Sequence, residues 1–149
     1  MYTLGVNLSR QRSACLLRDR GSPIAIVEAW LAGHSEIDSP AAFGRRHVSM
    51  PERSVAYCLT SAGISYVDLD VIVFCDVVLP TARAPRKLSV ADCVLRLPFA
   101  PQSRMLTMDP ALARAYSVSH LSGFVVDDGT ALGAALYGWH YEQSPNLRI

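Results

Sequence analysis

The sequence predicts a single α/β domain with a mixed sheet and the element order β-β-β-α-β-α-β-α, and three observations lead to this prediction. Residues 2–31 contain three β-rich runs separated by short polar turns, which is typical of an antiparallel meander. Residues 69–75 (LDVIVFC) are a nearly continuous apolar run, of the kind that parallel sheets bury on both faces. Residues 123–140 (GFVVDDGTALGAALYGWH) combine a β-rich run, a polar turn and a helix of small and apolar residues.

The N-terminal half is divided into elements by its turn residues. Strands are expected over residues 2–8, 13–17 and 24–31, and the connection RDRGSP between the last two carries a glycine. The polar, turn-rich stretch 33–50 predicts a loop. A helix is expected over residues 51–63, because its proline suits the first helical position and its glycine ends it. Its apolar side chains recur at helical spacing, at Val55, Cys58, Leu59 and Ala62.

The strand expected over residues 69–75 is followed by Asp76, at the end where open α/β sheets place functional groups. The stretch 81–102 is rich in proline and in basic residues, and residues 89–97 within it are either a short helix or a short strand. Its basic residues either dock an acidic partner or a phosphate, or belong to a solvated loop. They are Arg83, Arg86, Lys87 and Arg96.

The C-terminal part completes the predicted order. Asp109 is expected to cap a helix that starts at the following proline and runs to about Tyr116. A strand is expected near Phe124, and a last helix over residues 130–141 has its first threonine as a natural N-cap. This element order is that of an RNase H-like domain, the building block of the actin/hexokinase superfamily. In that superfamily two such domains face each other and bind a nucleotide between them. Residues 1–149 are enough for one such domain.

Composition excludes several classes of protein. Basic and acidic residues nearly balance, 14 against 13, so no overall charge favours nucleic acid or a membrane surface. No apolar run approaches the roughly 18 residues of a membrane span, and the first residues lack the pattern of a signal peptide. The four cysteines are scattered, which predicts reduced core residues of a cytoplasmic protein and no metal site. Half of the residues are hydrophobic, so either the sheet is deeply buried or a partner covers part of the surface.

Three runs of sequence point to a family. LGVNLSRQRSACLLRD resembles the N-terminus of the carbamoyltransferases that modify nodulation factors and antibiotics, where the pattern Gly-x-Asn-x-Ser-His-Asp-x-Ser-Ala opens the first hairpin. PERSVAYCLTSAGISYVDLDVIVF resembles that family's first helix and fourth strand. DDGTALGAALYGWH is similar to its late motif Gly-Asp-x-Gly-x-Ala-Leu-Gly-Ala-Ala-Leu. The resemblance spans most of residues 3–76 and 123–141.

The resemblance breaks at the residues that the family uses for chemistry. Arg10 and Gln11 stand where the family has histidine and aspartate, and Glu28 keeps one acid of a Glu-Glu-Arg stretch. Of the family's metal-binding His-His-x-x-x-His segment, this chain offers only His120 before the late motif. Asp127 aligns with the metal-coordinating aspartate, but one carboxylate cannot hold a metal without further ligands. The family's second domain, which binds carbamoyl phosphate, has no counterpart, so no catalytic residue and no metal ligand is assigned.

Two turns form the candidate site for an anion or a nucleotide. Its residues are Asn7, Ser9, Arg10 and Gln11 in the first turn, and Asp127, Asp128, Gly129 and Thr130 in the second. The alternatives are an ordinary hairpin turn and a capped helix with acids at its positive end. Arg10 can bind an anion but cannot act as a base, because its guanidinium stays protonated. Tyr137, Trp139 and Tyr141 close the last helix and are either core residues or aromatic anchors of an interface.

The resemblance and its gaps together imply a shortened carbamoyltransferase-like protein without catalysis, acting as an accessory or partner subunit in a biosynthetic enzyme complex. Two alternatives stay open. One is half of a composite O-carbamoyltransferase active site, completed by a homodimer or by a larger partner chain. The other is a small nucleotide- or anion-binding module that uses the two turns. No cofactor is assigned to the chain itself, and ATP or carbamoyl phosphate is expected only through a partner.

Overall fold

The structure is a computed structural model that describes residues 1–8, 11–19, 21–32, 51–75, 98, 100–120 and 129–144. Within these residues five strands form one sheet in the order β3-β2-β1-β4-β5. The strands are β1 (Tyr2–Asn7), β2 (Ser13–Arg18), β3 (Ile24–Val27), β4 (Val71–Cys75) and β5 (Arg104–Met108). β2 pairs antiparallel with both β1 and β3, whereas β4 pairs parallel with β1 and with β5. The predicted α/β class and mixed sheet are therefore confirmed.

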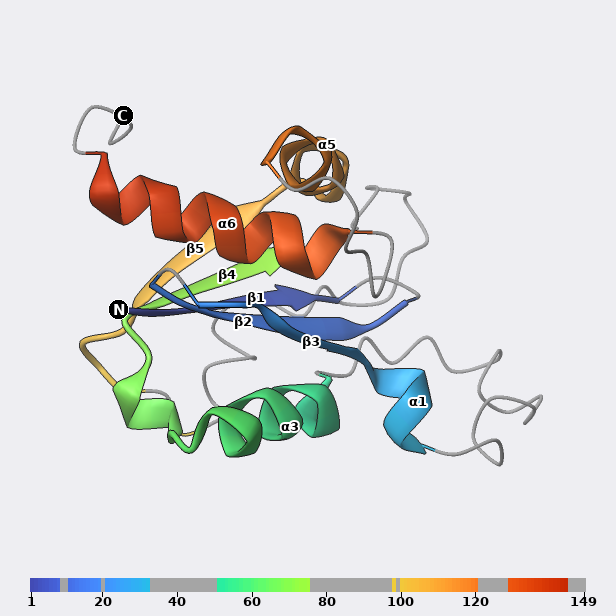
Figure 1. Ribbon diagram of the computed structural model, residues 1–149, viewed down its shortest axis with the longest axis vertical. Helices are drawn as coiled ribbons and strands as arrows, with labels where there is room; N and C mark the ends of the chain where they lie inside the picture. Colours follow the sequence, from blue (N-terminus) through green and yellow to red (C-terminus); the bar gives the residue numbers. More distant parts are fainter. Residues whose placement is uncertain are drawn as a thin grey trace, which may run out of the picture.

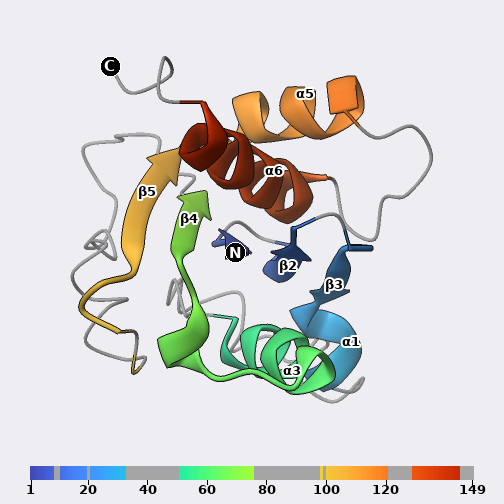
Figure 2. The same cartoon turned by 60° about the vertical axis from the view of Figure 1, so that its left-hand side comes forward.

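Helices cover both faces of the sheet. They are α1 (Glu28–Ala32), α3 (Glu52–Ala62), α5 (Pro110–His120) and α6 (Thr130–Gln143), and the short 3-10 helix η1 (Tyr66–Asp68) leads into β4. α3 packs on β2 and β3 from one side, and α6 packs on β1, β2 and β4 from the other, with α5 beside it. Figures 1 and 2 show the sheet between these two helical layers.

The central strands β1 and β4 are buried on both faces, because successive side chains of a strand alternate between the two helical layers. Leu4 and Val6 belong to the core on the α3 side. Val71 and Val73 belong to the core on the side of α5 and α6. Cys58 of α3 lies in the first of these cores, where burial raises the pKa of its thiol to about 12. Its environment therefore keeps this cysteine protonated and unreactive.

Two glycines bring backbones into direct contact on the α6 side. A Cβ added at Gly5 would collide with the backbone of Ala131, so α6 lies directly on β1. A Cβ added at Gly133 would collide with the backbone carbonyl of Ala113, so α6 also touches α5. The small residues of the last helix are thus explained by packing on two neighbours at once.

The strand predicted near Phe124 lies outside the described residues, and the sheet instead contains a strand that the sequence did not predict. This strand, β5, precedes α5 and pairs with β4 at the edge of the sheet. It was missed because an edge strand is only partly buried: Arg104 and Thr107 are exposed, which removes the apolar pattern. Along the described residues the helices and strands follow the order β-β-β-α-α-β-β-α-α, so the predicted order is wrong.

The third strand is shorter than predicted. It ends at Val27 instead of residue 31, because α1 begins at Glu28. The apolar run continues through this boundary, so the pattern alone does not mark it. The predicted helix over residues 51–63 is confirmed, and Gly63 ends it in the left-handed conformation that favours glycine, with φ of 67°. The loop expected over residues 33–50 lies outside the described residues.

Candidate functional site

Four strands of the sheet end at one edge. β1, β3, β4 and β5 run in the same direction, and β2 begins where they end. α6 runs the opposite way, because its residue Ala131 faces Gly5 whereas Gly138 lies over Thr3. The N-terminus of α6 therefore lies at the carboxyl end of β1, as Figure 1 shows. Open α/β sheets bind ligands at this edge, which we call the carboxyl edge.

The first predicted turn lies at the carboxyl edge between β1 and β2. Asn7, the last residue of β1, is fully buried between Ser13 of β2 and Cys75 of β4. Its side-chain Nδ2 donates a hydrogen bond to the carbonyl oxygen of Gln11 at 3.0 Å. The side chain of Gln11 is exposed. Asn7 therefore acts on the turn from inside the protein by holding its backbone.

The second predicted turn leads into α6. Gly129 has a left-handed backbone, with φ of 83° and ψ of 0°, and an added Cβ would collide with the hydroxyl of Ser117. Its carbonyl accepts the first helical hydrogen bond, from the N–H of Gly133 at 2.9 Å. Gly129 is thus the N-cap, whereas Thr130 is the first helical residue and is fully buried. The prediction that the threonine caps the helix is wrong by one residue.

The structure describes only part of the predicted site. The described members are Asn7, Gln11, Gly129 and Thr130, and those outside the described residues are Ser9, Arg10, Asp127 and Asp128. Asp76 also lies outside them. The described members come from the end of β1 and the start of α6, which share the carboxyl edge although they are far apart in the sequence.

Two carboxylates at the carboxyl edge act as helix caps. Oδ1 of Asp109 accepts hydrogen bonds from the N–H groups of Ala111 at 2.8 Å and Leu112 at 3.2 Å, which confirms the cap predicted for α5. Oε2 of Glu28 accepts hydrogen bonds from the N–H and the hydroxyl of Ser54, at 2.7 and 2.6 Å. Glu28 thereby caps α3 from a distant element, a role that the sequence did not indicate.

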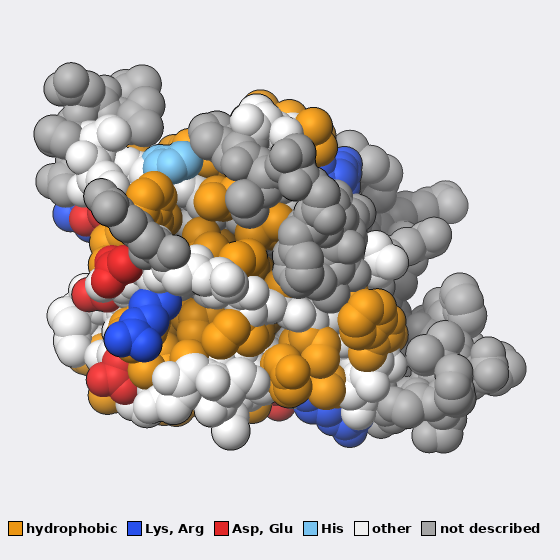
Figure 3. Space-filling view, viewed as in Figure 1, with side chains coloured by type: hydrophobic (Ala, Val, Ile, Leu, Met, Phe, Trp, Pro, Cys, Tyr) orange, Lys and Arg blue, Asp and Glu red, His pale blue; other side chains and the backbone are white. Residues whose placement is uncertain are grey.

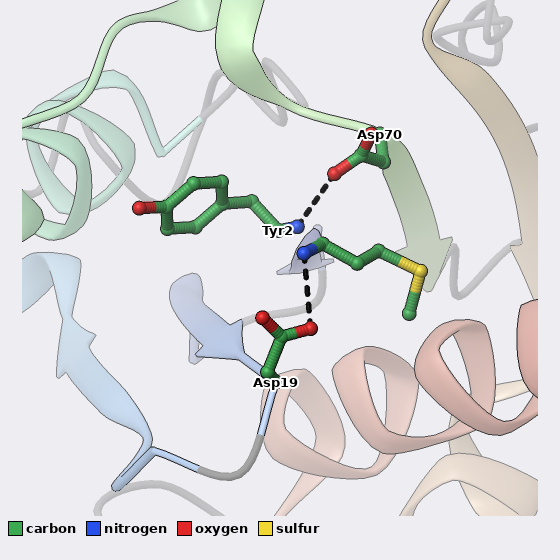
Figure 4. A network of polar contacts seen from close by, with 4 residues as sticks. Tyr2, Asp19 and Asp70 are labelled. Atoms are coloured by element: carbon green, nitrogen blue, oxygen red, sulfur yellow. Dashed lines mark hydrogen bonds and ion pairs between the residues drawn. The ribbon is translucent and has the colours of Figure 1, made fainter.

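The opposite edge of the sheet, the amino edge, carries polar contacts that hold the first strand. The ammonium group of Met1 pairs with Oδ1 of Asp19 at 2.9 Å. The N–H of Tyr2 donates to Oδ2 of Asp70 at 2.7 Å. Figure 4 shows the two acids on either side of the start of β1. Both carboxylates thus bind main-chain nitrogen atoms of this strand.

A pocket of about 280 Å³ lies at the amino edge beside the end of α6, and charged side chains line it. Nη1 of Arg104 contacts Oε1 of Glu142 at 2.6 Å. Hydrogen bonds from the backbone and the hydroxyl of Ser65 lower the pKa of Asp68. Figure 3 shows acidic and basic side chains next to each other at this edge, at the left of the view. These described groups have partners within the chain, so they do not form a binding site with charges of a single sign.

The aromatic residues of α6 pack against α5. The rings of Tyr116 and Tyr137 meet edge to face at 5.8 Å between centroids, and Tyr116 Oη lies 2.6 Å from Nδ1 of His140. The ring of Tyr141 lies 5.9 Å from that of Tyr137 between centroids, tilted by 38°, and Trp139 lies beside His140. Burial raises the pKa of Tyr116, and the neighbouring Tyr137 adds to the rise. All three predicted anchors are half-buried, so they contribute to packing inside the domain.

The fold and its edges define the chain as an α/β domain with two helical layers and a polar carboxyl edge at the start of α6. In the part of the chain that the structure describes, no three His, Cys, Asp or Glu side chains gather closely enough to hold a metal ion. No helix in the described ranges is long and apolar enough to cross a membrane.

Comparison with known proteins gives likenesses of fold. No protein-family model matches the chain, and no curated protein matches it. The chain is similar to YeaZ from Pseudomonas aeruginosa, with 20% identity and a TM-score of 0.47, over 80% of this chain and 49% of that chain. It is also similar to an uncharacterized protein with similarity to the peptidase YEAZ from Pseudomonas aeruginosa, with 20% identity and a TM-score of 0.49, over 82% and 49%. The chain spans about half the length of these structures.

These findings correct the resemblance to carbamoyltransferases, which is wrong: the similar structures are YeaZ and a YeaZ-like protein. The carbamoyltransferase-like accessory subunit and the composite O-carbamoyltransferase site are therefore wrong as well. The structure shows why the motifs misled. Gly5 and Gly133 occupy positions where backbones touch, so the glycine and alanine patterns are required by the packing of α6. Packing inside this chain is therefore sufficient to explain them, and they are no evidence of a particular chemistry.

Proposed function

We propose that this chain is a ligand-binding domain of the RNase H-like class and that it binds the phosphate group of a ligand at its carboxyl edge. The strand order β3-β2-β1-β4-β5, with β2 antiparallel to its neighbours, supports this class. In the actin/hexokinase superfamily, which is built from such domains, the ligand is a nucleotide held between two of them. ATP is therefore the first ligand to test.

The observation that carries the proposal is the position of α6. The contact between Gly5 and Ala131 sets the start of this helix at the carboxyl end of β1. The dipole of a helix places a partial positive charge at its N-terminus, which favours a phosphate. Arg10 adds a permanent positive charge to the same edge in this proposal. The proposed site consists of Asn7, Ser9, Arg10, Gln11, Asp127, Asp128, Gly129 and Thr130. Asn7 holds the first turn from inside the protein, and the carboxylates of Asp127 and Asp128 are assigned no contact with the phosphate, because they would repel it.

We further propose that a protein partner or a second copy of the chain supplies the opposite wall of the ligand site, in the cytoplasm. The exposed side chains of Leu112 and Val118 on α5 support a contact with another protein, since they are 63% and 75% exposed. The buried thiol of Cys58, which forms no disulfide and donates to the carbonyl oxygens of Ala14 and Ile24, supports a reducing compartment. Light scattering tests the second copy: a dimer is expected, and a monomer would require a different protein as partner.

Calorimetric titration with ATP and with inorganic phosphate tests the ligand. Arg10→Ala is expected to weaken phosphate binding about tenfold, because one charge-assisted contact is lost. Arg18→Ala is the matched control, since it removes the same charge from the end of β2 at the amino edge. If both variants lose the same affinity for phosphate, the effect comes from the overall charge and not from a contact of Arg10. The absence of binding by the unaltered chain to both ligands would overturn the proposal.

A further inference from the structure

Glu28 connects three segments that are far apart in the sequence. It is only 9% exposed and stands at the junction of β3 and α1. Its carboxylate accepts hydrogen bonds from the backbone N–H and hydroxyl of Ser54, at 2.7 and 2.6 Å, and from the N–H of Arg53 at 3.3 Å. Its own N–H donates to the carbonyl oxygen of Arg12 at 2.8 Å. One residue thus holds both the start of α3 and the end of the first turn.

The first turn is held from its other side by Asn7. The Nδ2 group of Asn7 donates to the carbonyl oxygen of Gln11 at 3.0 Å, one residue before the carbonyl that Glu28 binds. Two consecutive carbonyls of the turn therefore accept hydrogen bonds, one from the last residue of β1 and one from the first residue of α1. This places the return of the chain into β2 between Asn7 at the end of β1 and Glu28, which directly follows β3.

The chemistry of the contact requires a carboxylate. The first N–H groups of a helix have no partner within it, and α3 begins after Pro51, which makes no side-chain cap. A carboxylate only accepts hydrogen bonds, so its two oxygens serve all three donors, and the positive end of the helix favours its charge. A glutamine at position 28 would turn an N–H group toward one of these donors.

We infer that Glu28 is a positioning residue for the first turn and that it couples the turn to the N-terminus of α3. The functional consequence of this coupling rests on the proposed function: the capped α3 keeps the phosphate-binding turn in place. The coupling itself concerns Ser54, Glu28 and Arg12 and exists without a ligand. A movement of the start of α3 is therefore transmitted to the turn through one residue, whose carboxylate binds α3 and whose backbone N–H binds Arg12.

Hydrogen exchange of the unliganded protein, measured by NMR, tests the coupling. Ser54→Ala removes one hydrogen bond from the Glu28 carboxylate and does not touch Arg12. The exchange of the residue 28 amide is expected to quicken about fivefold to tenfold, as the loss of one hydrogen bond implies. The Asp70 amide, which donates to Tyr2 at the amino edge, is the control and is expected to be unchanged.

Faster exchange confined to the first turn of α3, with the residue 28 amide unchanged, would show a local cap only and would overturn the inference. Faster exchange at Asp70 to the same degree would mean global destabilisation and would overturn it too. Glu28→Gln is the second variant if Ser54→Ala does not fold, and the same pattern is expected from it. Phosphate titration of the variant then tests the consequence: severalfold weaker binding is expected. If the unaltered chain binds no phosphate, the proposed function fails while the exchange result still decides the coupling.

Discussion

The hydroxyl of Thr3 is fully buried on the central strand and has no hydrogen-bond partner among the described residues. The methyl group of its side chain lies against Gly138 of α6. The buried side chain of Asn7 on the same strand is different from that of Thr3, because its amide donates a hydrogen bond to the first turn. An unpaired buried hydroxyl costs about 1–3 kcal/mol in proteins, so Thr3 lowers the stability of the fold.

We expect Thr3→Val to raise the free energy of unfolding by about 1 kcal/mol, because it replaces the unpaired hydroxyl by a methyl group of similar size. Urea denaturation measures the change. Thr107→Val on the exposed edge strand β5 is the control and should change stability by less than about 0.5 kcal/mol. A less stable Thr3→Val variant would mean that the hydroxyl makes a favourable contact.

Which residues of the candidate site can be predicted depends on the range of their contacts. Asn7 was singled out by the resemblance of the first hairpin and Gly129 by the Asp-Asp-Gly-Thr turn, and both signals are local in the sequence. Glu28 was not identified as a helix cap, because the residues that it caps are 25 and 26 positions away. A signal exists nevertheless: Pro51 begins a helix without offering a capping side chain, so an acceptor must come from elsewhere.

Among the elements, those with a full apolar pattern were predicted from the sequence. α3 has a clear helical stripe and a terminal glycine, and β4 is buried at every position. β5 carries too few buried residues to show a period, because it lies at the edge of the sheet. α1 continues an apolar run, and its start is marked by tertiary contacts of Glu28 rather than by a local signal.

The contact between α5 and α6 gives a test at the scale of elements. Gly133→Ala is expected to destabilise the fold by about 1–3 kcal/mol, because the new methyl group would press on the backbone carbonyl of Ala113. Gln143→Ala, at an exposed position of the same helix, is the control and should change stability by less than about 0.5 kcal/mol. Thermal unfolding measures both variants. A Gly133→Ala variant as stable as the unaltered chain would contradict the close helix contact.

For the molecule as a whole, the sequence predicted the arrangement of layers correctly but the family wrongly. Apolar strands and a small-residue helix predict a sheet between helices, and the structure has this arrangement. The family was misassigned because the matching glycines and alanines serve packing that unrelated chemistries share. The two edges of the sheet differ: Arg104 and Glu142 form an ion pair at the amino edge, whereas the carboxyl edge receives the start of α6.

NMR titration of the isotopically labelled chain with ATP and with inorganic phosphate tests the central claim most directly, because it locates binding by residue. We predict shift changes at the backbone amides of residues 129–132 and at the side-chain amide of Asn7, all at the carboxyl edge. The amides of Asp70 and Glu142 at the amino edge should not shift. Shift changes confined to the amino edge, or none with either ligand, would contradict the account.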